Sequence, residues 1–238
     1  MIRFFSATKQ FFKQIWADAM LSVLLFVPLI MGLAFHFGVP ALEGFICAKA
    51  GKAVVLAPYY PLFDLLLAAM TPVMFSAAGA LVILDEADGG ISRAYITSPL
   101  GRSGYLLSRI GVPAVLATVY CVIVTAVFRL SDLSFTRILL LALCSGALGV
   151  TVALMVPSLA KNRVEGMAIS KLAGLIMLGL PAALLLPAPL KYAAGILPSF
   201  WMTELVFDGG GEWNVLPAIL TSALLSALFF RMFRKRVL

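Results

Sequence analysis

Charged side chains gather in one stretch of this chain, residues 84–110, which lies between two long apolar segments. Carboxylates and guanidinium groups at a membrane surface form ion pairs and charge-assisted hydrogen bonds with soluble partners. We therefore interpret the stretch as a polar connection between two membrane spans, on which a soluble partner acts. It holds an acidic cluster, a glycine pair and three arginines: Asp85, Glu86, Asp88, Gly89, Gly90, Arg93, Arg102 and Arg109.

No catalytic pattern accompanies this cluster in the sequence. The motifs G-x-S-x-G and H-E-x-x-H are absent, and the cysteines and the histidine lack metal-ligand spacing. Gly51 and Lys52 resemble the end of a phosphate-binding loop, but Ala53 replaces the required Ser or Thr. We expect no enzyme activity, and no metal or cofactor bound by this chain. Any energy from nucleotide has to come from another chain.

The composition is that of a polytopic membrane protein. Hydrophobic residues make up 62% and charged residues 12%, whereas a soluble domain has about 25% charged residues. The net charge of +7 could indicate nucleic acid binding, but the basic bias of cytoplasmic loops explains it better, and we expect no nucleic acid partner.

Apolar segments predict an all-α membrane protein with six transmembrane helices in one domain, residues 1–238. A span needs about 20 residues, and no alternating pattern suggests a β-barrel. Residues 38–61 are expected to form a loop, and residues 129–135 a tight turn. The spans are expected at about 19–37, 62–84, 107–128, 136–158, 167–187 and 215–233.

Residues 1–16 have aromatic pairs at helical spacing with basic residues between them. This pattern favours an amphipathic helix in the membrane interface, although a long first span or a signal peptide remain alternatives. Residues 188–214 predict short helices that re-enter the outer leaflet, or else an aromatic belt containing Trp201 and Trp213.

Basic residues set the orientation. With both termini in the cytoplasm, 13 of the 18 Lys and Arg residues fall on the inner side. Within the first inner loop, residues 91–97 can form a short helix. Ser98 and Pro99 then resemble an N-cap followed by the first residue of a new helix. The second inner loop, residues 160–171, weakly repeats this pattern with Glu165, Gly166 and Lys171. Both loops are also compatible with ordinary solvated connections.

Few charged residues lie within the spans. Asp64 is expected either to cap the start of span two or to contact a substrate. The other candidates for an apolar substrate path could equally be packing residues: Met70, Met74, Phe75, Phe200 and Trp201.

Three features together resemble the ABC-2 type permease subunits of bacterial ABC exporters. They are the amphipathic start, the Asp-Glu-x-x-Gly-Gly segment with Thr-Ser-Pro-Leu at 97–100, and residues 161–166, 170–171 and 197–201. The last set is similar to a subgroup of fluoroquinolone or other drug exporters. One departure is Gly89-Gly90-Ile91, where the family usually has Gly-Thr-(Leu/Ile).

The resemblance implies a permease in the bacterial cytoplasmic membrane that dimerises as a homodimer or heterodimer. It implies a separate ATPase, in two copies, that binds ATP and Mg²⁺ and docks on a coupling helix between spans two and three. The cargo would be hydrophobic or amphiphilic: a drug, peptide or lipid-like molecule. A secondary carrier or scaffold subunit without an ATPase is the alternative. The expected coupling residues are Glu86, Gly89, Gly90, Arg93, Ser98, Pro99, Arg102, Glu165, Gly166 and Lys171.

Overall fold

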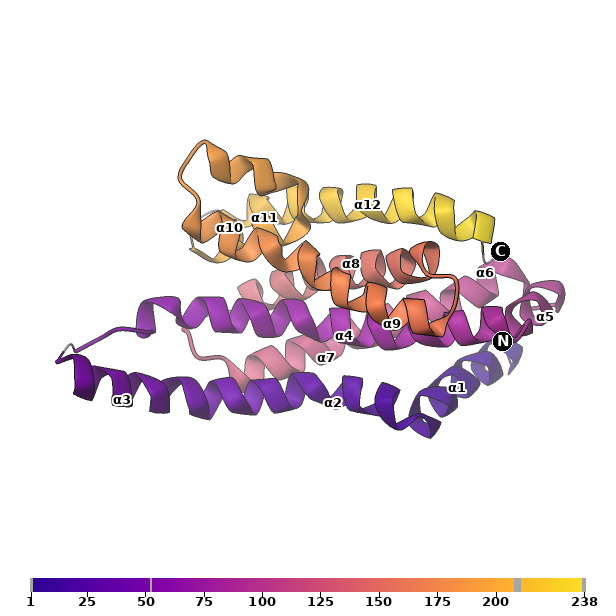
Figure 1. Cartoon of the computed structure of the whole chain (residues 1–238), viewed down its shortest axis with the longest axis horizontal. Helices are drawn as coiled ribbons and strands as arrows, with labels where there is room; N and C mark the ends of the chain where they lie inside the picture. The colour runs from indigo at the N-terminus through magenta and orange to yellow at the C-terminus, as the bar shows by residue number, and fades with distance from the viewer. Residues whose placement is uncertain (1, 52, 208–210, 237–238) are drawn as a thin grey trace.

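The computed structural model is a bundle of helices and describes residues 2–51, 53–207 and 211–236 (Figure 1). Within these residues, six helical runs are long and apolar enough to cross a membrane. The predicted all-α, six-span fold is therefore confirmed. The runs are Ala19–Lys49, Ala57–Asp88, Gly101–Phe128, Phe135–Leu159, Arg163–Leu185 and Glu212–Arg236.

The first half of the chain contributes the first three spans and, outside them, the helices α1 and α5. They are α1 (Ile2–Ala17), α2 (Ala19–Leu33), the π-helical turn η1 (Ala34–Gly38), α3 (Val39–Ala50), the short 3-10 helix η2 (Ala57–Tyr59), α4 (Tyr60–Asp88), α5 (Ile91–Thr97), α6 (Gly101–Leu106), the π-helical turn η3 (Leu107–Gly111) and α7 (Val112–Phe128).

The second half contributes the other three spans and the short helices between the last two. They are α8 (Phe135–Leu159), α9 (Arg163–Leu172), η4 (Ala173–Leu178), α10 (Gly179–Leu185), η5 (Leu190–Ile196), α11 (Pro198–Phe207), η6 (Glu212–Asn214) and α12 (Val215–Arg236).

The helices α4 and α8 form the centre of the bundle, and most of their residues are buried. Small residues allow them to pack closely. A Cβ atom on Gly149 would lie 2.9 Å from the Ser76 hydroxyl and 3.0 Å from the Pro72 side chain. The position of α4 at the centre matters for function, because α2, α7 and α9 all pack against it.

Both ends of the chain lie at the same end of the bundle (Figure 1). The start of α1, the end of α12, and α5 and α6 are found there, and we call it the terminal end. The opposite end, which we call the far end, carries α3, η5 and α11. An even number of spans requires both chain ends to lie on one side of the membrane.

The first span is longer than expected. Residues 38–50 were expected to belong to a loop, but they continue the helix as η1 and α3. Pro40 sits in the first turn of α3, directly after the π-helical turn, where the missing proline N–H disturbs the helix least. The helix ends at Gly51, whose φ of 63° is readily adopted only by glycine.

The polar connection between spans two and three is shorter than expected. Because α4 extends to Asp88, the acidic residues Asp85 and Glu86 belong to a helix and not to a loop. Because α6 begins at Gly101, Arg102 and Arg109 belong to the third helical run.

The helix α1 is separate from the first span. It buries Ala7, Phe11 and Ile15, spaced four residues apart, against the terminal end of the bundle. The chain turns at Asp18, whose Oδ1 accepts hydrogen bonds from the backbone N–H groups of Met20 (2.9 Å) and Leu21 (3.3 Å). The alternative in which residues 1–16 begin a long first span is therefore wrong.

Short helices connect spans five and six at the far end, as the pattern in residues 188–214 predicted. The helix α11 buries Phe200, Met202 and Leu205 against its neighbours α10 and α12. Residues 208–210 of this segment lie outside the described part of the chain.

Candidate functional site

A buried ion pair at the terminal end joins spans two and three. The Arg109 Nε donates to both carboxylate oxygens of Glu86, at 3.1 and 2.9 Å, and its Nη2 donates to Oε1 at 2.6 Å. The Nη1 donates to the backbone carbonyl of Ala7 in α1, at 2.8 Å. We call this arrangement of Glu86, Arg109 and the Ala7 carbonyl the buried joint. It links α1, α4 and η3 through one guanidinium group.

Aromatic rings surround the guanidinium of the buried joint. Its Cζ lies 4.9 Å from the Tyr95 ring centroid, 5.4 Å from Phe11 and 5.6 Å from Tyr105. Rings within about 6 Å attract a cation through their electron-rich faces. Tyr95 belongs to α5, and its hydroxyl donates to the Gln10 side chain of α1 at 2.9 Å. The short helix α5 is therefore also connected to the joint.

The π-helical turn η3 determines where Arg109 points. A π-helical turn inserts one residue into an α-helix and is frequent at functional sites. Within this turn Ser108, Arg109 and Ile110 are buried, while Leu107 is exposed. Sequence reasoning missed the role of Arg109 because it counted the residue among the basic residues of the membrane surface. The signal that could have found it is the apolar stretch on both sides of Arg109, with Tyr105, Leu106 and Leu107 before it and Ile110 after it.

Glu86 does not lie on the surface. It was expected to contact a soluble partner directly, but its exposed fraction is 1%. The reason is that α4 continues through Asp88 and turns this residue inward, toward Arg109. Of the other coupling residues expected in this segment, Gly89, Gly90, Arg93, Pro99 and Arg102 are exposed, and Ser98 is half-buried.

The corner between α5 and α6 differs from the expected helix start. Ser98 terminates α5: its hydroxyl donates to the Tyr95 carbonyl (2.6 Å) and accepts from the Leu100 N–H (3.2 Å). A turn closed by the Gly101 N–H and the Ser98 carbonyl follows, at 3.0 Å. Because this turn takes up Pro99 and Leu100, α6 begins at Gly101, and the interpretation of Ser98 as its N-cap is wrong.

A groove of about 520 Å³ runs between α1 and α5. We call it the α1–α5 groove. Its floor includes Ala7, whose carbonyl belongs to the buried joint, and one wall includes Tyr95, whose ring lies over Arg109. A partner protein bound in this groove would therefore touch Ala7 and Tyr95, which both contact Arg109 of the buried joint. The other lining residues are Ser6, Gln10, Ile91, Ala94, Ser98, Pro99 and Leu100.

The residues expected in the second loop have other positions. Asn162 caps α9 by accepting from the Glu165 N–H (2.9 Å), and Glu165 in turn accepts from the Lys161 N–H (2.7 Å). Gly166 lies where α9 crosses α4, and a Cβ there would meet the side chains of Leu81 and Leu84. Lys171 is exposed.

Arg163 is a second polar contact that sequence reasoning missed. Its Nη2 donates to Asp18 at the α1–α2 corner, and its Nη1 donates to Asp85 of α4 at 2.7 Å. The hydrogen bond from Arg163 lowers the pKa of Asp18 below its usual value. A pocket of about 280 Å³ adjoins these side chains. We call it the Arg163 pocket.

Asp64 is not the N-cap of span two, because α4 already begins at Tyr60. Its exposed fraction is 1%. Its Oδ1 accepts from the Leu130 N–H (2.7 Å), and its Oδ2 accepts from the N–H (2.9 Å) and the hydroxyl of Ser131. Asp64 therefore holds the turn between α7 and α8, with both oxygens engaged.

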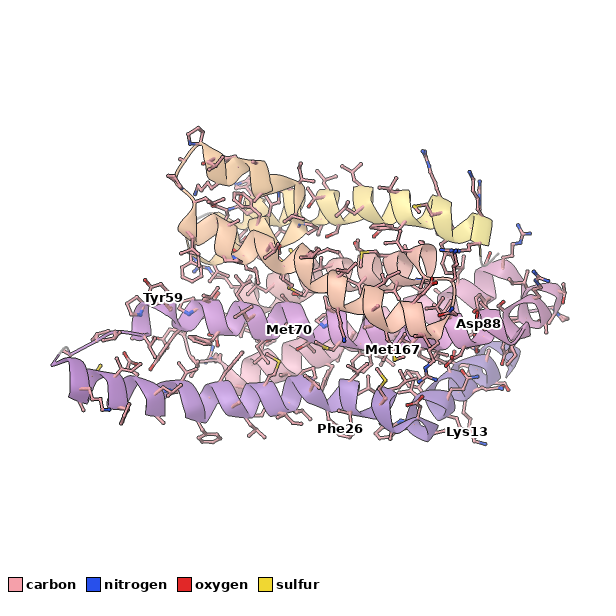
Figure 2. The ribbon with its side chains drawn as sticks, viewed as in Figure 1. Lys13, Phe26, Tyr59, Met70, Asp88 and Met167 are labelled. Atoms are coloured by element: carbon pink, nitrogen blue, oxygen red, sulfur yellow. The ribbon has the colours of Figure 1, made fainter. Side chains whose placement is uncertain are left out.

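The candidate path residues fall into two groups. Met70 and Met74 are half-buried on α4, and Figure 2 labels Met70 on this helix and Met167 on α9, which packs against it. Phe75 instead packs on Tyr120, at 5.7 Å between ring centroids.

The other two candidates belong to the packing of the far end. The Phe200 side chain is completely buried, and its ring lies 5.2 Å from the ring of Trp201. The Trp201 indole N–H donates to the Gly195 carbonyl at 2.7 Å.

The architecture defines a multi-pass α-helical membrane protein. In the described residues, no group of His, Cys, Asp and Glu could hold a metal ion. A family model described as fluoroquinolones export permease protein Rv2686c-like matches residues 11–234. The chain belongs to this family of export permeases, and the predicted relationship to fluoroquinolone exporters is confirmed. The family name indicates a transport protein and not an enzyme.

Two relatives from Mycobacterium tuberculosis illustrate the similarity. They are named fluoroquinolones export permease protein MT2760 (strain CDC 1551 / Oshkosh) and Rv2686c (strain H37Rv). Each is 24% identical over 224 residues, which cover 91% of this chain and 88% of the relative. The family match over residues 11–234 includes Glu86 and Arg109 of the buried joint.

Proposed function

We propose that the chain is the permease subunit of an ATP-driven ABC exporter for hydrophobic or amphiphilic substrates. Two copies of a separate ATPase would bind ATP and Mg²⁺, and a second permease subunit, identical or different, would complete the transporter. The terminal end would face the bacterial cytoplasm, in keeping with the excess of basic residues there. The names of the relatives make a fluoroquinolone the first drug to test as a substrate.

The contact between the α1–α5 groove and the buried joint is the observation that carries this proposal. Ala7 lines the groove and accepts a hydrogen bond from Arg109, which in turn holds Glu86 of α4. An ATPase surface seated in the groove would displace α1 and α5. The joint would pass that movement to spans two and three, because coupling needs a continuous chain of packed or bonded groups.

Glu86 has a different role in this mechanism from the one expected from the sequence. It would receive the movement inside the protein, while the groove residues together with Arg93 of α5 and Arg102 of α6 would meet the ATPase. The substrate would move along a face that includes Met70 and Met74, since flexible methionine side chains adapt to varied apolar ligands.

An ion-driven carrier is the alternative, and it needs acidic groups that can bind and release an ion within the membrane. Within the described part of the chain, the buried acidic side chains of the spans are Asp64 and Glu86. Both hold protein groups, so the ATP-driven exporter is the better supported function.

Uptake of ciprofloxacin into everted membrane vesicles from the native host tests the proposal. We expect uptake that requires ATP and is stopped by vanadate. Ala94→Arg, which places a charge in the groove, should abolish it. Thr97→Arg is the matched control on α5, outside the groove, and should leave it intact. Uptake that an uncoupler stops and vanadate does not would establish the ion-driven carrier instead.

A further inference from the structure

The Arg163 pocket lies at the terminal end, where the α1–α2 corner, α4 and α9 meet. Its polar lining consists of Gln14, Asp18, Asp85 and Arg163, and its apolar lining of Ala17, Leu21 and Val82. The charged side chains are accessible, since 27% of Asp18, 30% of Arg163 and 40% of Asp85 is exposed. A small headgroup can therefore enter this pocket.

The lining of the pocket carries more negative than positive charge. One guanidinium, that of Arg163, is shared between the carboxylates of Asp18 and Asp85. Asp88 lies one turn further along α4 and adds negative charge, while Lys13 and Lys161 are exposed and do not line the pocket. An additional cation would therefore be attracted, and an additional anion repelled.

The pocket also contains an unused hydrogen-bond acceptor. The side-chain oxygen of Gln14 is shut off from solvent and accepts no hydrogen bond from the described part of the chain. An acceptor left without a donor in this way costs free energy. If the Gln14 side chain turns toward the pocket, a ligand that brings N–H donors would remove this cost, and an ammonium group brings both the charge and the donors.

The surroundings of the pocket suit an apolar tail. Leu21 and Val82 close its inner wall, and Trp16 and Met20 are exposed on the corner beside Asp18. We propose that the Arg163 pocket binds the ammonium headgroup of a cationic amphiphile whose apolar part lies along this corner. Its role as an entry site for cargo rests on the proposed export function, whereas the binding itself follows from the pocket.

Binding at this position would act on three spans at once. The ligand ammonium competes with Arg163 for Asp18 and Asp85, and so it weakens the contact that holds α9 to α2 and α4. The cargo would thereby loosen the terminal end between spans one and five as it enters.

A fluorescent ammonium probe tests the assignment without the ATPase. The full chain in phosphatidylcholine nanodiscs is titrated with monodansylcadaverine, which carries an ammonium group. The neutral probe is its N-acetyl derivative, which has the same dansyl group and alkyl chain but no charge. Empty nanodiscs provide the lipid background. We expect the ammonium probe to bind more tightly than the acetylated one, with affinity lowered about tenfold in Asp85→Asn and in Asp18→Asn. Asn retains the ability to cap α2 at position 18.

A second variant separates ligand binding from a purely structural role. Arg163→Gln frees both carboxylates, so it should bind the probe more tightly than the wild type, opposite to the Asp variants. Asp132→Asn, at an exposed site of the far end, is the control and should change nothing. Equal affinity of both probes, signal from lipid alone, or weaker binding in Arg163→Gln would overturn the proposal.

Nanodiscs that contain phosphatidylethanolamine identify the source of the headgroup. A weaker apparent affinity there shows that a lipid ammonium occupies the pocket, and an unchanged affinity shows selection of a foreign amphiphile. Both results support an ammonium site. Because no transport is measured, loss of ATP-driven uptake in the vesicle experiment would refute the export function and leave this binding result standing.

Discussion

Glu86 and Arg109 form a bidentate ion pair in which neither side chain is more than 1% exposed. Such a pair does little for net stability, because removing two charges from water costs about as much as their attraction returns. The pair does fix one geometry, since an isolated buried charge is strongly unfavourable. It thereby connects spans two and three with α1.

Removing one partner of this pair should destabilise the protein. We expect Glu86→Ala to lower the free energy of unfolding by about 3–5 kcal/mol, because Arg109 is left buried without its counter-charge. The apolar double variant Glu86→Leu with Arg109→Met should recover most of this loss. The loss is measured as the shift of the thermal transition in detergent, followed by size-exclusion chromatography. If the joint couples movement, the double variant is stable yet shows no vanadate-sensitive uptake.

The crossing of α9 over α4 requires glycine at position 166. Gly166→Val should place methyl groups against Leu81 and Leu84 and cost about 1–3 kcal/mol through overpacking. Gly174→Val is the control on the same span, because a Cβ there meets nothing within 4 Å. The comparison uses the yield of monodisperse protein and its thermal transition. Equal loss in the two variants would mean that helix propensity, and not the crossing, decides the outcome.

The turn between α7 and α8 depends on Asp64. Asp64→Ala removes the acceptor for the Leu130 and Ser131 N–H groups, and we expect a loss of about 2–3 kcal/mol, as for unsatisfied buried donors. Limited proteolysis around residues 129–134 should become faster. Asp64→Asn keeps one acceptor oxygen and should have a smaller effect. An unchanged cleavage rate in Asp64→Ala would show that the turn is held by other contacts.

The pair of Asp18 and Arg163 should make stability depend on pH. The pKa of Asp18 is lowered in the folded protein, chiefly by the hydrogen bond from Arg163, relative to a reference of 3.8. Its stabilising contribution is therefore complete above pH 3.8 and is lost as the pH falls through the lower pKa of the folded state. The stability difference between wild type and Asp18→Asn should be constant near neutral pH and shrink below pH 4. A difference that grows in acid would contradict this assignment.

Hydropathy was sufficient to predict the six spans, but not their ends. Pro40 suggested a loop, yet the helix passes through it because a π-helical turn precedes it. Asp85 and Glu86 suggested a loop as well, yet they remain helical because Arg163 and Arg109 pair with them. A partner far away in the sequence overrode the local preference in the second case, and no local pattern reports such a partner.

Residues 84–110 were predicted to hold the candidate site, and that prediction still awaits a functional test. They contain Glu86 and Arg109 of the buried joint, and α5 forms where a short helix was expected. Counting basic residues for orientation treats every arginine as a surface charge, and so it cannot separate Arg102, which is exposed, from Arg109, which is buried. The apolar stretch around Arg109 distinguishes it from Arg102, and a count of charges does not consider such neighbours.

The helix α3 extends the far end of the protein beyond the turn between α7 and α8. Phe35 contacts Phe63, the neighbour of Asp64, which holds the α7–α8 turn. Beyond the level of this contact, α3 continues toward the far end for 12 residues. At 1.5 Å per residue, α3 extends about 18 Å, and Figure 1 shows it projecting past α7. It carries the half-exposed Cys47, whereas Cys121 and Cys144 are buried. With the proposed orientation, a membrane-impermeant maleimide added to intact cells would label Cys47 on α3. This native cysteine can therefore report on which side of the membrane the far end lies.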